Sequence, residues 1–138
     1  MARLLRRTVR SDRGAASTQL VLVVPALLLI ALLVVQFALL WHARHIAQYA
    51  AERALAAARV EDGTAADGRT QARRSLAALG SRVLTAPSVT AERSTARTTV
   101  RVDGTVTRVL PVPGLELHAS GSASGPTERI TTPAGAQP

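Results

Sequence analysis

One uninterrupted apolar stretch, from Leu20 to Trp41, constrains this chain more than any other feature. Its 22 residues (LVLVVPALLLIALLVVQFALLW) carry no charge, and Gln36 is the one strongly polar side chain among them. An α-helix rises about 1.5 Å per residue, so the stretch would be about 33 Å long, close to the hydrocarbon thickness of a bilayer. Because it is apolar on every side, we interpret it as a single membrane-spanning helix.

The rest of the chain is long enough for one small domain. That part runs from His42 to Pro138 and contains a single aromatic side chain, Tyr49. The chain has no cysteine, so disulfides are excluded and the core must be built from small and β-branched side chains. A core of this kind is weak, which favours packing against a partner.

The arginines ahead of the apolar stretch set its expected orientation. Residues 1–14 carry five arginines and one aspartate. Positive flanks stay on the cytoplasmic side, so we expect residues 1–14 to be a basic cytoplasmic leader and the C-terminal domain to be extracytoplasmic. A nucleic-acid-binding arm is disfavoured, because the leader adjoins a span and lacks aromatic side chains for base stacking. A cleaved secretory signal is disfavoured because the apolar run is too long.

The junction between leader and span resembles a known processing signal. Residues 13–20 read RGAASTQL: a glycine after a basic leader, small residues, a polar residue, and then the long apolar helix. This order resembles the class III signal of type IV pilins and pseudopilins, and more narrowly the TadE-like family of the tight-adherence (Flp) pilus systems. In that family the prepilin peptidase cuts after the glycine, on the cytoplasmic side. The resemblance therefore implies a cut between Gly14 and Ala15.

Gln19 departs from the family pattern, which usually has a glutamate five residues after the glycine. In pilins that carboxylate is thought to meet the N-terminal ammonium of a neighbouring subunit during assembly. An amide brings no charge, so this pairing would be weaker. The departure weakens the case for incorporation into a filament more than the case for cleavage, and it fits a minor or priming subunit. In the other interpretation, Gln19 is an interfacial polar residue at the end of an anchor.

Three residues within the span are expected to shape its behaviour. Pro25 removes a backbone donor and is expected to kink the helix. Gln36 either faces lipid near the outer boundary or forms a hydrogen bond with a partner helix. Trp41 is expected to mark the outer interface, because an indole can keep its ring in the lipid boundary and its N–H in water.

The helix is expected to continue past the membrane, giving one long helix over residues 15–60. No glycine or proline interrupts the chain between His42 and Gly63, and alanine, the strongest helix former, dominates. His42 and His45 share a face, but we expect no metal site, because further ligands are lacking. Small side chains recur at helical spacing and should let another backbone approach closely: Ala43, Ala47, Ala50, Ala54 and Ala57.

The remaining sequence predicts a small α+β extracytoplasmic domain over residues 61–124. Residues 61–70 contain Asp-Gly twice and predict a solvated loop. A second helix is predicted over residues 70–84, ended by Pro87. After Pro87 apolar and polar residues alternate, which predicts a three-stranded antiparallel meander with its apolar face on the helices.

The turns of this meander are less sharply defined by the sequence. Asp103-Gly104 is either a tight hairpin or a bulge within one long strand, and the Pro-Val-Pro-Gly segment at 111–114 favours a hairpin connection. Residues 125–138 are polar, with Pro and Gly, and predict a flexible C-terminal tail.

No catalytic or metal-ligating pattern stands out, so we expect neither an enzyme nor a cofactor. The resemblance implies a TadE-like minor pseudopilin: a single-pass membrane protein, cut by prepilin peptidase, whose partners are other pilins or pseudopilins and a pilus assembly platform. No nucleic acid or small-molecule substrate is expected. The alternative is a single-span, membrane-anchored extracytoplasmic binding module unrelated to pili.

Overall fold

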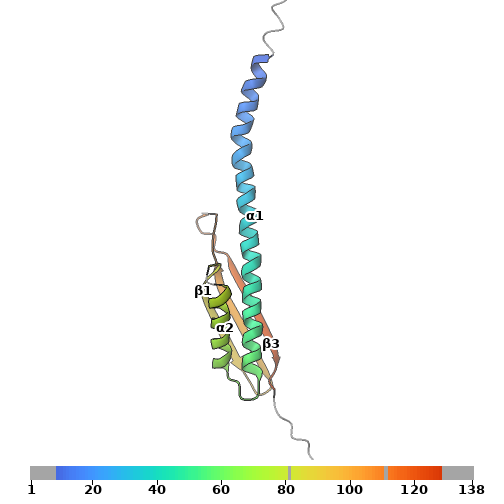
Figure 1. The fold of residues 1–138 in the computed structure, drawn as a ribbon, viewed down its shortest axis with the longest axis vertical. Coiled ribbons are helices and arrows are strands. Elements are labelled where there is room, and N and C mark those ends of the chain that lie inside the picture. Colours follow the sequence, from blue (N-terminus) through green and yellow to red (C-terminus); the bar gives the residue numbers. More distant parts are fainter. Residues whose placement is uncertain (1–8, 81, 111, 129–138) are drawn as a thin grey trace, which may run out of the picture.

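The structure, a computed structural model, describes residues 9–80, 82–110 and 112–128. A very long helix carries a second helix and a three-stranded sheet near its C-terminal end, while its N-terminal half projects away from them (Figure 1). The elements are α1 (Val9–Arg59), α2 (Ala65–Leu79), β1 (Leu84–Arg93), β2 (Arg97–Val106) and β3 (His118–Pro126). The predicted α+β fold, with a long apolar N-terminal helix, a second helix and an antiparallel meander, is confirmed.

Helix α1 is continuous over 51 residues and passes through Pro25. It ends at Arg59, one residue from the expected end. It begins at Val9, ahead of the expected start at residue 15. An established helix extends outward at little cost, since each added residue gains one hydrogen bond, so the sequence before Gly14 joins it.

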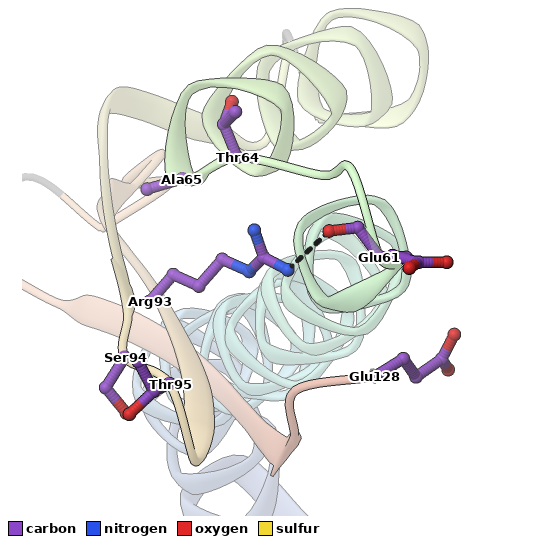
Figure 2. A pocket seen from close by; sticks show the side chains of 7 residues that line it. All are labelled: Glu61, Thr64, Ala65, Arg93, Ser94, Thr95 and Glu128. Atoms are coloured by element: carbon purple, nitrogen blue, oxygen red, sulfur yellow. Dashed lines mark hydrogen bonds between the residues drawn. The ribbon is translucent and has the colours of Figure 1, made fainter. Parts of the chain in front are cut away.

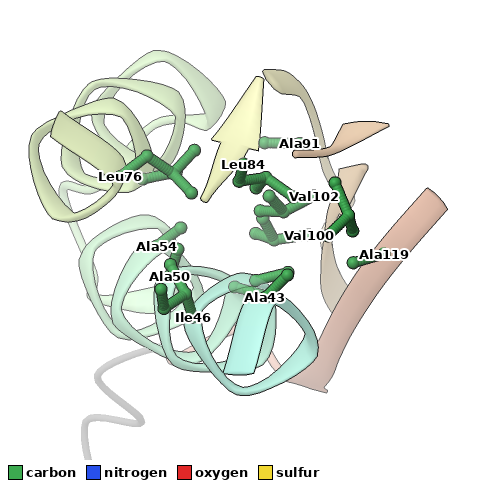
Figure 3. Packing of buried hydrophobic residues seen from close by; sticks show 14 residues of the cluster. Ala43, Ile46, Ala50, Ala54, Leu76, Leu84, Ala91, Val100, Val102 and Ala119 are labelled. Carbon is green, nitrogen blue, oxygen red and sulfur yellow. The ribbon is translucent and has the colours of Figure 1, made fainter. Parts of the chain in front are cut away.

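The core lies between the two helices and one face of the sheet (Figure 3). The predicted alanine stripe is confirmed: Ala43, Ala47, Ala50 and Ala54 have no exposed surface, although Ala57 is only half-buried. The sheet contributes larger side chains to the same core, among them Leu84, Val100, Val102 and Val106. Small side chains on the helix therefore face β-branched ones on the sheet.

Glycines bring the backbones of this core unusually close. A Cβ atom added at Gly121 in β3 would lie 2.3 Å from the backbone nitrogen of Gln48 in α1. One added at Gly68 in α2 would lie 2.9 Å from the Cβ atom of Ala58. Such contacts leave no room for a side chain, so the sheet and α2 both press directly on the α1 backbone.

Helix α2 differs from the prediction, covering Ala65–Leu79 in place of residues 70–84. Thr64 is its N-cap: the Thr64 hydroxyl accepts from the Asp67 N–H at 3.1 Å, and the Asp67 carboxylate accepts from the Thr64 N–H at 2.9 Å. This capping box starts the helix inside the predicted loop. The Thr64 hydroxyl also donates to the Asp67 carboxylate at 2.6 Å, and this bond, followed by the one from the Thr64 N–H, lowers the pKa of Asp67 from its ordinary value. The helix ends at Gly80, whose N–H donates to the carbonyl of Leu76, and not at Pro87.

The sheet has the order β1-β2-β3, and all of its pairs are antiparallel. Asp103-Gly104 forms no hairpin, because both residues pair on within β2. A bulge does occur at this level, but on β1: Thr85 pairs with Thr105 and Ser88 with Asp103, which leaves two residues of β1 opposite Gly104. Pro87 is one of the two, and an edge strand can hold it there without losing a ladder hydrogen bond.

The connection between β2 and β3 is longer than a hairpin at 111–114 and covers residues 107–117. The alternating residues on either side of 111–114 therefore lie mostly in a loop, because prolines at 111 and 113 cannot donate to a ladder. Strand β3 extends to Pro126, past the expected domain boundary at 124. Glu128 N–H then donates to the carbonyl of Arg59 at 2.8 Å. The rest of the predicted tail, residues 129–138, lies outside the described residues.

Candidate functional site along helix α1

The residues of the expected processing signal lie in the first turns of α1. Gly14, Ala15 and Gln19 are all part of this helix. Residues 1–8 of the basic leader lie outside the described residues, and side chains of α1 are described from Leu20 onward. The cut between Gly14 and Ala15 and the assembly role of Gln19 stay predictions.

The apolar half of α1 has no protein cover. Apart from the half-buried Leu32, its large apolar side chains between Leu20 and Phe37 are 42–77% exposed. Within the described part of the chain, α1 is the one helix long and apolar enough to cross a membrane. Exposing this much apolar surface to water is strongly unfavourable, whereas lipid accepts it. Pro25 lies inside this half without interrupting the helix, and a kink there stays a prediction.

Gln36 marks the border between the bare half and the covered half of α1. Its side chain is 6% exposed. The Oε1 atom accepts from the Val109 N–H at 2.7 Å and from the Leu110 N–H at 3.5 Å, and Nε2 lies 3.4 Å from the Thr107 carbonyl. Both predictions for Gln36 are therefore wrong. Its side chain does not face lipid, and its amide is not available to a partner helix. Its amide is used by the chain's own β2–β3 connection.

A second glutamine fixes the sheet to α1 in the same way. Gln48 donates from Nε2 to the Ser122 carbonyl at 3.2 Å, and its Oε1 accepts from the Ser122 N–H at 3.2 Å. This pair of bonds joins the helix to the edge strand β3. Sequence reasoning missed Gln48, because a glutamine on an exposed helix looks ordinary when its partner lies 74 residues away.

The aromatic and histidine side chains gather just after this border. His45 packs edge-on against Trp41, with ring centroids 5.3 Å apart. Among the described residues, no group of three or more His, Cys, Asp or Glu side chains comes together as a metal site would require. His45 thus extends the aromatic contact of Trp41 along the helix.

An open depression of about 600 Å³ lies at the other end of α1 (Figure 2), lined by Glu61, Thr64, Ala65, Arg93, Ser94, Thr95 and Glu128. The guanidinium of Arg93 crosses it and donates to the carbonyls of Val60 at 2.9 Å, of Glu61 at 3.0 Å, and of Gly63. These carbonyls follow the last turn of α1, where a cation is favoured. Arg93 therefore ties β1 to the end of the helix, a structural task that sequence reasoning missed.

Glu128, which follows β3, also lines the depression. Arg59 forms an ion pair with Glu128 at 3.3 Å, and both side chains are about half exposed. An exposed pair of this kind contributes little stability. The Arg93 Nη donors are already engaged by carbonyls, and Nε is buried without a hydrogen-bond partner among the described residues. The depression therefore offers a ligand few accessible donors, and we assign it no chemistry.

The comparisons with known proteins agree with the position of these features. Residues 14–56 match the TadE-like protein family. No curated protein and no solved structure matches the chain. The family match starts at Gly14 and covers both halves of α1, including Gln19, Gln36 and Gln48. TadE-like proteins are pilin-like and generally not enzymes, in line with the expectation from the sequence. The resemblance predicted from the junction is thus confirmed over residues 14–56, which are similar to the TadE-like family.

Proposed function

We propose that the chain is a minor pseudopilin of a tight-adherence (type IV-like) pilus or secretion apparatus, with residues 1–14 cytoplasmic and the domain extracytoplasmic. The observation that carries this proposal is the extent of the family match. It begins at the glycine after which the cut is expected and continues almost to the end of α1. The resemblance thus follows the segment that a pilin keeps after processing.

The layout of α1 supports the same proposal. The domain contacts the helix from Gln36 onward and leaves residues 20–35 free. A bare apolar half can stay in the bilayer while the subunit is stored there, and it can pack against the helices of other subunits during assembly. The sheet and α2 would remain outside the membrane in both situations.

Processing would change the charge at the start of the helix. A cut between Gly14 and Ala15 removes the arginine-rich leader and leaves the ammonium of Ala15, four residues before Gln19 and on the same face of the helix. A glutamate at position 19 could form an ion pair with the ammonium of a neighbouring subunit, whereas glutamine can only accept a hydrogen bond. Such a weaker contact suits a subunit that primes or adjusts a filament.

The test is the mass of the full chain, isolated from membranes with and without co-expressed prepilin peptidase. We expect the mass to fall by residues 1–14 only when the peptidase is present. Gly14→Ala should still be cut, because the added methyl group is small, whereas Gly14→Leu should block the cut. A pilin known to be a substrate, expressed in the same cells, shows that the peptidase is active.

An N-terminus that keeps residues 1–14 beside a processed control pilin would overturn the proposal. That outcome would favour the alternative, a single-span anchored binding module unrelated to pili. Equal processing of the native chain and Gly14→Leu would also count against it, because the cut would then not depend on the glycine.

A further inference from the structure

The loop between β2 and β3, residues 107–117, carries apolar side chains that the domain covers only in part. Val109, Val112 and Leu115 are 37%, 45% and 40% exposed. The loop projects beyond the sheet and lies beside α1, on the side where the bare apolar half begins (Figure 1). This apolar tip, which we define as residues 109–110 and 112–115, therefore lies next to the candidate membrane helix.

The depth of the tip follows from its hydrogen bonds to Gln36. The apolar residues before Gln36 are those from Leu20 to Val35, 16 in number. They give about 24 Å of helix, short of the hydrocarbon thickness of about 30 Å. The span must therefore include Gln36 and the residues up to Trp41 if it is to cross the bilayer. Gln36 precedes Trp41 by five residues, which is about 7.5 Å along the helix. The backbone of Val109, which is hydrogen-bonded to Gln36, therefore lies about that far inside the level of Trp41.

We propose that the apolar tip is inserted in the outer leaflet of the bilayer, beside the point where α1 leaves it. The partner is thus lipid, contacted by a loop of the domain in addition to the span. This inference goes beyond pilus function and rests only on the part of that proposal in which α1 crosses the membrane. In this arrangement two segments of the chain contact the bilayer: the membrane-spanning half of α1 and the apolar tip.

Most backbone N–H groups in the described part of the tip have a hydrogen-bond partner, which suits an apolar environment, although that of Gly114 has none among the described residues. A buried amide without a partner is costly in lipid. The N–H groups of Val109 and Leu110 donate to Gln36, that of Val112 donates to the Leu110 carbonyl at 2.9 Å, and that of Leu115 to the Val112 carbonyl at 3.3 Å. Residues 111 and 113 are prolines and have no N–H to satisfy.

The charged groups of the loop lie at its base. Arg108 donates from Nη1 to the Leu115 carbonyl at 3.1 Å, which closes the loop below its tip. Glu116 pairs with His118 at 3.8 Å on the side towards the sheet, away from the tip. The loop is therefore apolar at its tip and charged towards the sheet, as the outer leaflet is apolar inside and polar at its surface.

The experiment uses the absence of cysteine from the chain. Three single-cysteine variants of the full chain, Val112→Cys, Thr95→Cys and Leu28→Cys, are labelled with a small fluorophore and reconstituted in phosphatidylcholine vesicles. Thr95 is exposed in the turn at the opposite end of the sheet, and Leu28 is exposed in the bare half of α1. Fluorescence is quenched either by lipids brominated on the acyl chains or by iodide on both sides of the membrane.

If the tip is in lipid, brominated lipid quenches the labels at residues 112 and 28, and iodide quenches only the label at residue 95. Equal iodide quenching at residues 112 and 95, with the label at 28 in lipid, overturns the inference and leaves the span intact. A label at residue 28 open to iodide overturns the membrane span itself. Protection of residue 112 from iodide without quenching by brominated lipid, and only at high protein-to-lipid ratio, would indicate a second copy of the chain and would also overturn the inference.

Discussion

The two halves of helix α1 have opposite relations between hydrophobicity and burial. The half from Leu20 to Val35 consists mostly of leucine and valine and leaves nearly all of these side chains exposed. In the half from Gln36 to Arg59 alanine is the commonest residue, and it is completely buried at several positions. Size explains the difference: a helix lined with alanine lets a sheet and a second helix come close, whereas leucine and valine would hold them away.

The domain is therefore held on α1 by close backbone contact more than by large apolar side chains. The closest contact is between Gly121 and the backbone at Ala47 and Gln48. In the bare half of α1 no side chain is limited in this way. Substitutions that add volume should therefore be costly in one half and harmless in the other, and each of the following experiments tests this difference.

The largest effect is expected for Gly121→Ala. The added Cβ atom would lie 2.4 Å from the carbonyl carbon of Ala47, and a helix backbone cannot yield as a side chain does. We expect a loss of about 3 kcal/mol in the free energy of unfolding of the domain, at the upper end for overpacked sites. Urea unfolding of the full chain in detergent micelles, followed by circular dichroism, measures it.

Gly125→Ala is the matched control on the same strand. A Cβ atom there would meet only the Leu55 and Arg59 side chains, at 3.6 and 3.7 Å, which are ordinary contacts. The stability should change by less than about 0.5 kcal/mol. Equal losses for the two glycines would mean that close approach to α1 is not what fixes the sheet.

A second experiment adds the same side chain to both halves of α1. Ala50→Leu inserts three carbon atoms into a fully buried position and should cost about 2 kcal/mol, measured by the same urea titration. Ala31→Leu makes the same change on an exposed position in the bare half and should leave the domain unchanged. If Ala50→Leu is also neutral, the alanine stripe reflects helix propensity alone.

The halves of α1 also show how far sequence reasoning reached. The long apolar helix, the alanine stripe and the antiparallel meander were predicted, because each rests on a periodicity that only nearby residues determine. The third alternation, at 115–120, was misplaced, since β3 covers His118–Pro126. The start of α2 was misplaced because two Asp-Gly pairs concealed the capping box between Thr64 and Asp67. In the sequence, the Asp-Gly pairs indicated a turn more strongly than Thr64 and Asp67 indicated a helix cap. The close approach of Gly68 to Ala54 and Ala58 explains why α2 contains that glycine.

The residues that join distant segments could not be predicted in the same manner. Gln36 stood out as a polar residue in an apolar run, but its partners lie 71 to 74 residues later in the chain. Arg93 looked like one more charge on a strand, although it holds the carbonyls that follow α1. No local pattern encodes such pairings. The expected processing residues, Gly14 and Gln19, were found by resemblance alone.

The third experiment compares the two glutamines that fasten the domain to α1. Gln36→Leu leaves the Val109 N–H without its acceptor in a part-buried place, which should cost about 1–2 kcal/mol in the free energy of unfolding. Gln48→Leu removes similar bonds at an exposed site, where water replaces them, so the loss should be about 0.5 kcal/mol or less. Trypsin cleavage after Arg108 should also accelerate in Gln36→Leu only. Identical rates in both variants would show that Gln36 does not hold the loop.

The smallest expected effect is a loss of domain stability at low pH. It should affect the domain packed on the covered half of α1 and leave the bare half helical. Hydrogen bonds from Thr64 lower the pKa of Asp67 from its ordinary value of 3.8, so the unfolded chain binds this proton more readily than the folded one. The stabilisation is complete above that ordinary value and is lost as the pH falls through the lowered value of the folded state. Domain stability should therefore decrease below about pH 4 in the native chain, with a shallower decrease in Asp67→Asn, which starts from a lower stability at neutral pH. Circular dichroism against pH in micelles measures both, and the helical signal of residues 20–35, which contain no titratable group, should persist throughout. If Asp67→Asn loses stability in acid as steeply as the native chain, the capping box is not the source of the decrease.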